Sequence, residues 1–226
     1  MNQYHFSNRN NKLSVTYLIL IIAPLVFGCR GNVKEENKNR ASVSSLTLHV
    51  GDEKYAVIDT KESVISWKGA SLMGSNAHNG YIYLSKGELM IENGQLRGGT
   101  IEVDMNTIED KNHKSDNNLV HHLKDPDFFE VEKFPFSTIK LNKVVSINDQ
   151  DKSITGNLTI KGMTHSVTFP AKIEVRNGVV KANGRMVIDR AKWNVRYKSA
   201  KFNELLADQT IADSIEFHMS IVTMKK

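Results

Sequence analysis

The sequence predicts an all-β domain, specifically an eight-stranded antiparallel β-barrel with one short inserted α-helix. Three observations support this fold class. Apolar and polar residues alternate through most of the second half, Asn-Gly pairs stand at positions 93–94 and 177–178, and only one segment has convincing helical spacing. Alternation with a period of two is typical of strands that have one buried and one wetted face. Closing such strands into a barrel removes exposed sheet edges, and a two-sheet sandwich is the alternative.

The alternation is clearest in the second half of the chain. Ile154, Leu158 and Ile160 share one strand face, and polar residues occupy the other. The same pattern predicts strands over residues 154–161, 167–176, 180–189 and 215–221. Asn177-Gly178 predicts a tight hairpin between two of these strands, because this dipeptide readily adopts the positive φ angles that a type I′ turn requires.

Four shorter segments in the first half bring the predicted number of strands to eight. They cover residues 64–68, 81–85, 88–92 and 100–105. Asn93-Gly94 joins the last two by a second predicted hairpin.

The one convincing helix lies between the two sets of strands. Ser115 can cap it, Leu119, Val120 and Leu123 share a face, and Asp125-Pro126 ends it. The segment that follows, residues 125–135, holds three phenylalanines and two prolines. Such a segment is too apolar for a free loop, so we expect it to pack over an apolar opening.

The first 53 residues predict export and anchoring. Arg9 and Lys12 precede an apolar run over 13–27, which is shorter than the ~20 residues of a membrane span and is typical of a signal peptide. Residues 25–29, LVFGC, resemble the lipobox of bacterial lipoproteins, with Cys29 as the lipidated residue and a bulky Phe27 as the departure. The alternative is ordinary cleavage. The predicted organisation is a signal peptide at 1–28, a flexible polar tether at 29–53 and the barrel at 54–226.

Composition excludes several classes of function. Cys29 is the only cysteine, so an intramolecular disulfide, a cysteine zinc site and a redox pair are all excluded. Removal of residues 1–28 takes away Arg9 and Lys12 and no acid, which lowers the formal net charge from +5 to +3. Because the charges alternate in sign along most strands, we expect no nucleic-acid partner.

Several stretches resemble the YceI-like family of exported bacterial proteins, which are related in architecture to the lipocalins. They are NLVHHLKDPDFFEVEKFP at 118–135, GNLTIKGMT at 156–164, IDR at 188–190 followed by Trp193, and IAD at 211–213. The resemblance implies a lipocalin-like barrel with an apolar tunnel for an isoprenoid lipid and no catalytic residue. Together with the lipobox-like segment, it predicts a protein of the cell envelope that faces the periplasm or the cell surface and contacts the membrane through Cys29.

The candidate tunnel residues combine aromatic side chains with apolar positions of the predicted strands. They are Trp67, Phe128, Phe129, Phe136, Gly156, Leu158, Ile160, Phe169, Ile173, Gly184, Met186, Ile188, Trp193 and Phe217. Gly156 and Gly184 stand on the apolar face of their strands, where a missing side chain leaves room for a ligand. The alternative is that the two glycines relieve barrel curvature. The alternative for Trp67 and Trp193 is that they pack in the core and do not contact a ligand.

Two other functions stay open from the sequence. A hydrolase or metal-dependent enzyme would use the polar region around His113, Asp116, His121 and Asp127, with His122 and Asp125 beside them. Adjacent His121 and His122 diverge by ~100° on a helix, which argues against joint metal ligation. A barrel filled by its own side chains would instead serve as a scaffold for protein partners. We therefore expect no cofactor and no metal, and a homodimer is as compatible with the sequence as a monomer.

Overall fold

The computed structural model describes residues 54–70, 77–204, 206 and 209–225. The predicted signal peptide, Cys29 and the tether lie outside these residues and stay predictions. Among the described residues, no helix is long and apolar enough to cross a membrane.

The described chain is mostly β-strand, with one α-helix and one 3-10 helix. The strands are β1 (Lys54–Val57), β2 (Val64–Ala70), β3 (Ala77–Glu92), β4 (Gln95–Asp110), β5 (Phe136–Ser146), β6 (Asp151–Ile160), β7 (Met163–Arg176), β8 (Val179–Asp189) and β9 (Ser214–Val222). The helices are α1 (Asn118–Lys124) and the 3-10 helix η1 (Arg190–Trp193).

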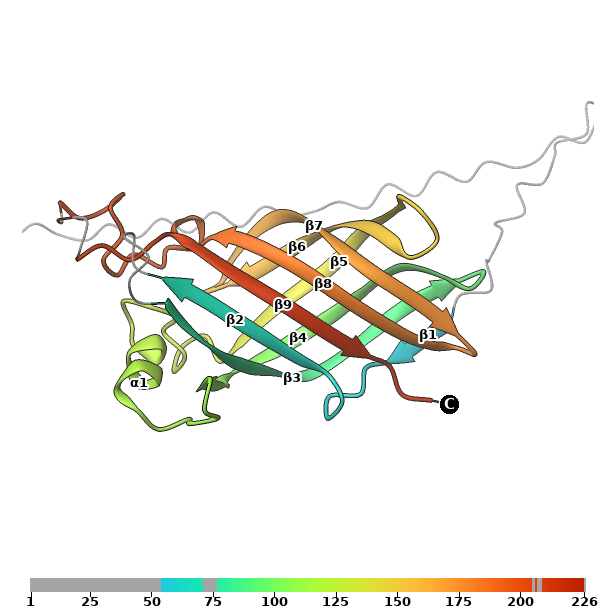
Figure 1. Ribbon diagram of the computed structural model, residues 1–226, viewed down its shortest axis with the longest axis horizontal. Coiled ribbons are helices and arrows are strands. Elements are labelled where there is room, and N and C mark those ends of the chain that lie inside the picture. Colours follow the sequence, from blue (N-terminus) through green and yellow to red (C-terminus); the bar gives the residue numbers. More distant parts are fainter. Residues whose placement is uncertain (1–53, 71–76, 205, 207–208, 226) are drawn as a thin grey trace, which may run out of the picture. The chain divides into compact units, whose positions relative to one another are not determined.

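The strands close into the predicted eight-stranded antiparallel barrel (Figure 1). Neighbouring strands follow the order β3-β2-β9-β8-β7-β6-β5-β4, and β4 pairs back with β3 to complete the ring. β1 pairs with the far part of β3, where Tyr55 lies opposite Met90, while β2 pairs with the near part, where Trp67 lies opposite Gly80. β1 and β2 therefore share one position of the barrel.

Two strand predictions were wrong in detail, although the predicted count agrees with the closed ring. Residues 81–85 and 88–92 belong to one continuous strand, β3, whose pairing with β4 shifts between Leu84 and Lys86. β5 was not predicted, because a similar shift between Leu141 and Lys143 breaks the alternation halfway along it. The two errors offset each other in the number of strands.

The helix α1 begins two residues later than the sequence suggests. Its N-cap is Asn117 and not Ser115: the Asn117 side chain accepts a hydrogen bond from the Val120 amide at 2.9 Å. The prediction of its end at Asp125 is confirmed. Val120 and Leu123 are buried, so the apolar face of the helix packs against the barrel as expected.

The segment after α1, residues 125–135, packs closely as predicted. Its backbone bonds to the end of the helix, with Phe129 N donating to Leu123 O at 3.2 Å and Val131 N to Lys124 O at 3.0 Å. From the β6–β7 turn, the buried Lys161 donates to Pro126 O at 2.9 Å. Phe128 is only 5% exposed. We call residues 125–135 the lid.

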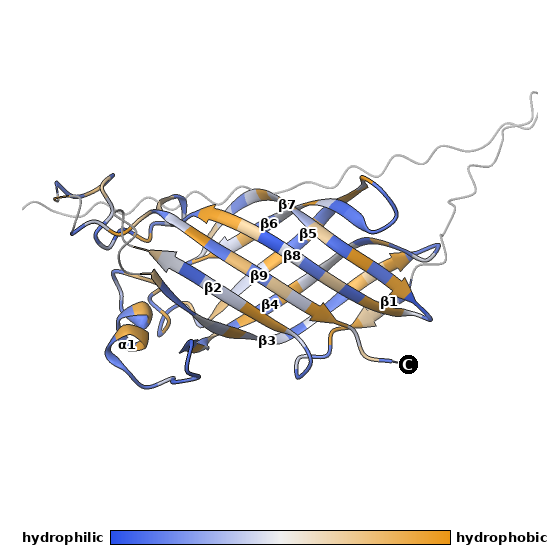
Figure 2. Cartoon of the chain, in the orientation of Figure 1, coloured by the Kyte–Doolittle hydropathy of each residue, from blue (hydrophilic) through white to orange (hydrophobic). Residues whose placement is uncertain are grey.

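The barrel core comes from the alternating strand positions. Figure 2 shows bands of hydrophobic and hydrophilic residues following one another along the strands. In β6, Ile154, Leu158 and Ile160 are buried, and the polar residues between them reach solvent to different degrees. The inward positions of the other long strands contribute in the same way to one continuous core.

Candidate functional site

Antiparallel up-and-down topology brings alternate connections to the same end of the barrel. The β4–β5 connection, which carries α1 and the lid, therefore shares an end with the β6–β7 turn and with the long β8–β9 connection, residues 190–213. Figure 1 shows α1 and the β8–β9 connection at one end, with the β7–β8 hairpin at the other. We call the first of these the helix end.

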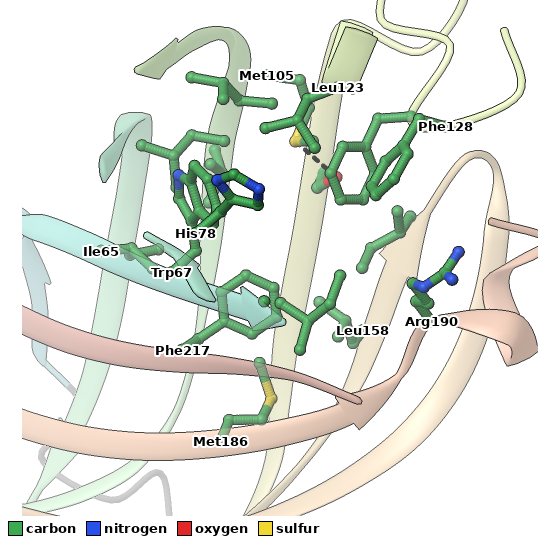
Figure 3. Close-up of a pocket in the computed structure, with 18 of the residues that line it drawn as sticks. Ile65, Trp67, His78, Met105, Leu123, Phe128, Leu158, Met186, Arg190 and Phe217 are labelled. Carbon is green, nitrogen blue, oxygen red and sulfur yellow. Dashed lines mark hydrogen bonds between the residues drawn. The ribbon is translucent and has the colours of Figure 1, made fainter. Parts of the chain in front are cut away.

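An apolar cavity of about 330 Å³ lies inside the barrel toward the helix end. Its side walls are residues of β2–β6, β8 and β9, and residues of α1, the lid and the β8–β9 connection line it at the helix end. Trp67 and Phe217 on one side face Phe128 and Leu158 across the space (Figure 3). The volume is at the low end of the range for small-molecule sites, and most lining side chains are hydrocarbon.

Aromatic rings in edge-to-face contact form the helix end of the cavity. Phe128 meets Phe129 edge-on with ring centroids 5.0 Å apart, and His122 of α1 meets the Tyr197 ring at 4.0 Å. The Phe128 ring also contacts His122 and Tyr197, with centroids 6.0 Å and 6.3 Å apart, so the lid and α1 are joined to the β8–β9 connection, which lies about 60 residues further along the chain. The rings hold the end wall of the cavity together.

Arg190 is the buried cation beside the cavity. Its guanidinium donates to Val195 O at 2.8 Å, to Ala212 O at 3.1 Å and to Ile211 O at 3.1 Å. Asp213 lies 3.4 Å away. Burial lowers the pKa of Arg190, and the charge of Asp213 opposes that shift. Arg190 therefore links the beginning of the β8–β9 connection to its end, and its side chain forms part of the cavity wall.

Half of the predicted tunnel residues line this cavity. They are Trp67, Phe128, Phe129, Leu158, Ile160, Met186 and Phe217. They come from β2, the lid, β6, β8 and β9, and the fold brings them together as the family resemblance implied. Their role in holding a ligand stays a prediction.

The two glycines do not line the cavity, which corrects the interpretation that they make room for a ligand. At Gly156 a Cβ atom would lie 2.7 Å from the Lys140 carbonyl oxygen, so glycine permits a close approach of β5 and β6 beside the β5 irregularity. At Gly184 it would lie 3.3 Å from the Phe169 ring and 3.0 Å from Met219 Cε. The structure thus favours the curvature and packing alternative.

Five larger candidates also lie outside the cavity lining. Phe136 points outward and is 47% exposed, because Ser137 takes the inward position at the start of β5. Phe169 and Ile188 are buried in the core, with Phe169 packed on the Gly184 backbone. Ile173 borders a polar hollow of about 560 Å³ among the hairpin turns at the other end.

Trp193 is the fifth of these candidates. It is 2% exposed, its Nε1 donates to Leu158 O at 3.1 Å, and its ring meets His165 edge-on. This contact ties η1 to the barrel wall. Trp193 is therefore a buried packing residue, whereas Trp67 lines the cavity.

Sequence reasoning missed many of the lining residues. Ile65, Ile101, Val103, Met219 and Ile221 stand on strands that the sequence did predict, so alternation alone could have identified them. Tyr197, Ile211 and Ala212 come from the irregular β8–β9 connection, which carries no periodic signal. Further lining residues are Gly69, His78, Ile82, Met105, Ile108, Leu119, His122, Leu123, Ser137, Thr138, Ile139, Arg190, Lys198 and Ile215.

The His/Asp region around α1 separates into distinct pairs. His113 Nδ1 lies 2.6 Å from Glu109, and His121 Nε2 lies 2.6 Å from Asp116. His122 Nδ1 lies 3.1 Å from Asp125. In the described ranges, only His122, Asp125 and Asp127 come close enough to share a metal ion, and both carboxylates are exposed. The structure therefore does not gather His113, Asp116, His121 and Asp127 into one site.

The fold and the cavity define a closed antiparallel β-barrel with an apolar internal chamber. A family model, the YceI-like domain, matches residues 57–223, and the chain belongs to this family. The YceI-like fold is a binding-protein fold and is not a known class of enzyme.

Curated relatives share part of the sequence. A UPF0312 protein of Shewanella denitrificans is 30% identical over 123 residues, half of this chain and 63% of that protein. A UPF0312 protein of Pseudomonas putida is 26% identical over 111 residues, or 49% of this chain and 56% of that protein. The chain thus spans less than two thirds of the length of these relatives.

Solved structures share the fold at low sequence identity. BcnA of Burkholderia cenocepacia has a TM-score of 0.60 at 17% identity, over 74% of this chain and 99% of that one. A polyisoprenoid binding domain from Saccharophagus degradans, implicated in plant cell wall breakdown, has a TM-score of 0.55 at 9% identity, over 76% and 100% of the two chains. These likenesses establish the barrel architecture.

Proposed function

We propose that this protein binds an isoprenoid-type lipid in the apolar cavity and carries, stores or sequesters it. The observation that carries the proposal is the cavity itself, a predominantly apolar chamber inside a closed barrel. Burial of a lipid chain there contributes about 0.8 kcal/mol per CH₂. The polyisoprenoid binding domain with the same fold gives independent support for this ligand class.

The cavity geometry bears on chain length. At about 330 Å³ the cavity suits a short prenyl chain as it stands. A longer chain would need inward side chains to rearrange. Met105, Met186 and Met219 line the cavity, and methionine adapts to irregular volumes more readily than branched side chains.

Native mass spectrometry with lipid extraction tests the proposal. The full-length protein, isolated without prolonged detergent exposure, is expected to retain a prenyl lipid or quinone. A protein that is recovered empty, and that captures no prenyl lipid when several chain lengths are offered, would overturn it. The enzyme alternative predicts instead that His122→Ala removes a bound metal ion.

We further propose that the protein is exported and held in the cell envelope through lipidated Cys29. The support is the sequence pattern over 1–29. The predicted tether, residues 29–53, has 25 residues and spans at most ~90 Å, which keeps the barrel within reach of the bilayer. Metabolic labelling with a fatty-acid analogue should mark the wild type and not Cys29→Ser. Equal labelling of both would contradict the anchor.

A further inference from the structure

Some polar groups in the cavity wall already have hydrogen-bond partners within the protein, and others do not. Ser137 donates its hydroxyl to Met105 Sδ at 3.1 Å. The Arg190 guanidinium donates hydrogen bonds to three backbone carbonyls. Lys198 is exposed at the rim, with its Nζ 5.4 Å from the centroid of the Tyr197 ring. Among the described residues that line the cavity, no buried cation is therefore free to bind an anion.

Two buried polar atoms of the wall have no hydrogen-bond partner within the described part of the chain. They are Trp67 Nε1 on β2 and His122 Nε2 on α1. A third such atom in the described part, Asp213 Oδ1, lies 3.4 Å from the Arg190 guanidinium and is compensated by its charge. Buried polar groups without partners are uncommon in folded proteins and call for an explanation. Both remaining ones belong to cavity-lining side chains.

The chemistry of the two atoms is complementary. Indole Nε1–H can only donate, so Trp67 requires an acceptor. His122 Nδ1 lies 3.1 Å from an Asp125 carboxylate oxygen, which places the proton of the neutral ring on Nδ1. His122 Nε2 is then an acceptor and requires a donor. A hydroxyl group can meet either requirement, whereas a carbonyl or ether oxygen can meet only that of Trp67.

We propose that the cavity selects lipids with an uncharged oxygen-bearing head, for which Trp67 supplies the donor and His122 the acceptor. This inference rests on the proposed lipid-binding function and specifies its ligand class as a prenyl alcohol or prenyl phenol, whose hydroxyl group can both accept from Trp67 and donate to His122. A diphosphate head is disfavoured, because its charge would enter an apolar wall with no free cation. Both atoms are buried, so lining side chains must shift when the head enters, and the lining methionines are flexible enough to make such a shift.

Four C15 probes that differ only at the head test the assignment on the full-length protein. Farnesol offers a donor and an acceptor, farnesyl methyl ether offers an acceptor, farnesene offers neither, and farnesyl diphosphate is charged. We expect farnesol to bind most tightly, the ether about tenfold more weakly, and farnesene and the diphosphate more weakly still, since one net hydrogen bond is worth roughly tenfold in affinity.

Two variants separate the roles of the two residues. Trp67→Phe keeps an aromatic ring and removes the donor, so it should weaken farnesol and the ether about tenfold and leave farnesene unchanged. His122→Phe should weaken farnesol alone. His121→Phe is the matched control, because His121 neighbours His122 on α1 and does not line the cavity.

The outcomes are distinguishable. Equal affinity of the wild type for farnesol and farnesene, or tighter binding of the diphosphate, would refute the polar subsite and leave lipid binding intact. A uniform loss for all probes in Trp67→Phe would also refute it, because that result indicates a packing role. If no probe binds the wild type, the proposed function fails together with this inference.

Discussion

The indole ring of Trp67 lies against Gly80, its partner across β2 and β3. A Cβ atom at position 80 would come within 2.8 Å of Trp67 Cζ2 and would overlap the Glu109 carbonyl oxygen. Glycine at this position lets the tryptophan ring approach the β3 backbone closely at the cavity wall. Gly80 is therefore confined between the Glu109 backbone carbonyl and the Trp67 side chain.

Gly80→Ala should lower the free energy of unfolding by about 1–3 kcal/mol, because the added methyl group overpacks this contact. Gly69→Ala is the matched control. Gly69 also borders the cavity, but nothing lies within 4 Å of its added Cβ, so the change should stay within about 0.5 kcal/mol. Urea unfolding of both variants measures the difference. Equal stabilities would contradict the contact.

Trp193→Phe should destabilise the fold by about 1–3 kcal/mol, because the buried Leu158 carbonyl loses the indole donor. Trp67→Phe loses no internal hydrogen bond and should change the free energy of unfolding much less. Thermal unfolding of the two variants compares the tryptophans directly. A larger loss in Trp67→Phe would reverse the assignment of Trp193 to packing and Trp67 to the cavity.

Arg190→Met should destabilise the fold by about 3–5 kcal/mol, because three carbonyls and Asp213 lose a buried partner. Arg185→Met removes an exposed pair with Glu216 and should change stability by less than about 1 kcal/mol. Denaturant titration checks the contrast. Arg190→Met with wild-type stability would mean that the β8–β9 connection is held by other contacts.

Glu216 gives the stability a dependence on acid pH. The hydrogen bonds from Arg185 lower the pKa of Glu216 from 4.5 to about 2. The folded state therefore binds this proton less readily than the unfolded state, so the contribution is complete above about pH 4.5 and is lost as the pH falls toward 2.

Both Glu216→Gln and Arg185→Gln should flatten this dependence. Melting temperatures recorded from pH 6 to pH 2 provide the measurement, and the wild type should lose more than either variant below about pH 4.5. Parallel curves for the three proteins would show that Glu216 titrates alike in the folded and unfolded states.

Strand alternation predicted β6, β7, β8 and β9 well, because each keeps one face on the core through most of its length. It failed where pairing shifts by one residue, in the middle of β3 and of β5, since a bulge moves the following side chains to the other face. The α1 cap was misplaced because Ser115 and Asn117 are both good capping residues, and only the backbone path selects Asn117.

Only part of the candidate site could be predicted from strand alternation. Alternation identifies inward positions, but it does not tell which part of the barrel is hollow. Leu158 borders the cavity, whereas Phe169 on the neighbouring strand is buried against Gly184. That distinction depends on which large side chains meet across the barrel. The lid phenylalanines Phe128 and Phe129 were predicted as site residues because so apolar a segment is not expected to form a free loop and must pack against an apolar surface.

The capture of a prenyl lipid by two matched variants tests the central claim most directly. Val103→Phe places a larger side chain in the cavity wall, and Val145→Phe makes the same change at an exposed position of β5. Radiolabelled farnesol retained through gel filtration of the full-length proteins is the measurement. We predict that Val103→Phe binds farnesol at least tenfold more weakly than the wild type and that Val145→Phe binds it with unchanged affinity. The binding free energies of the two variants should then differ by at least about 1.4 kcal/mol. Equal retention by two folded variants would contradict binding in the cavity.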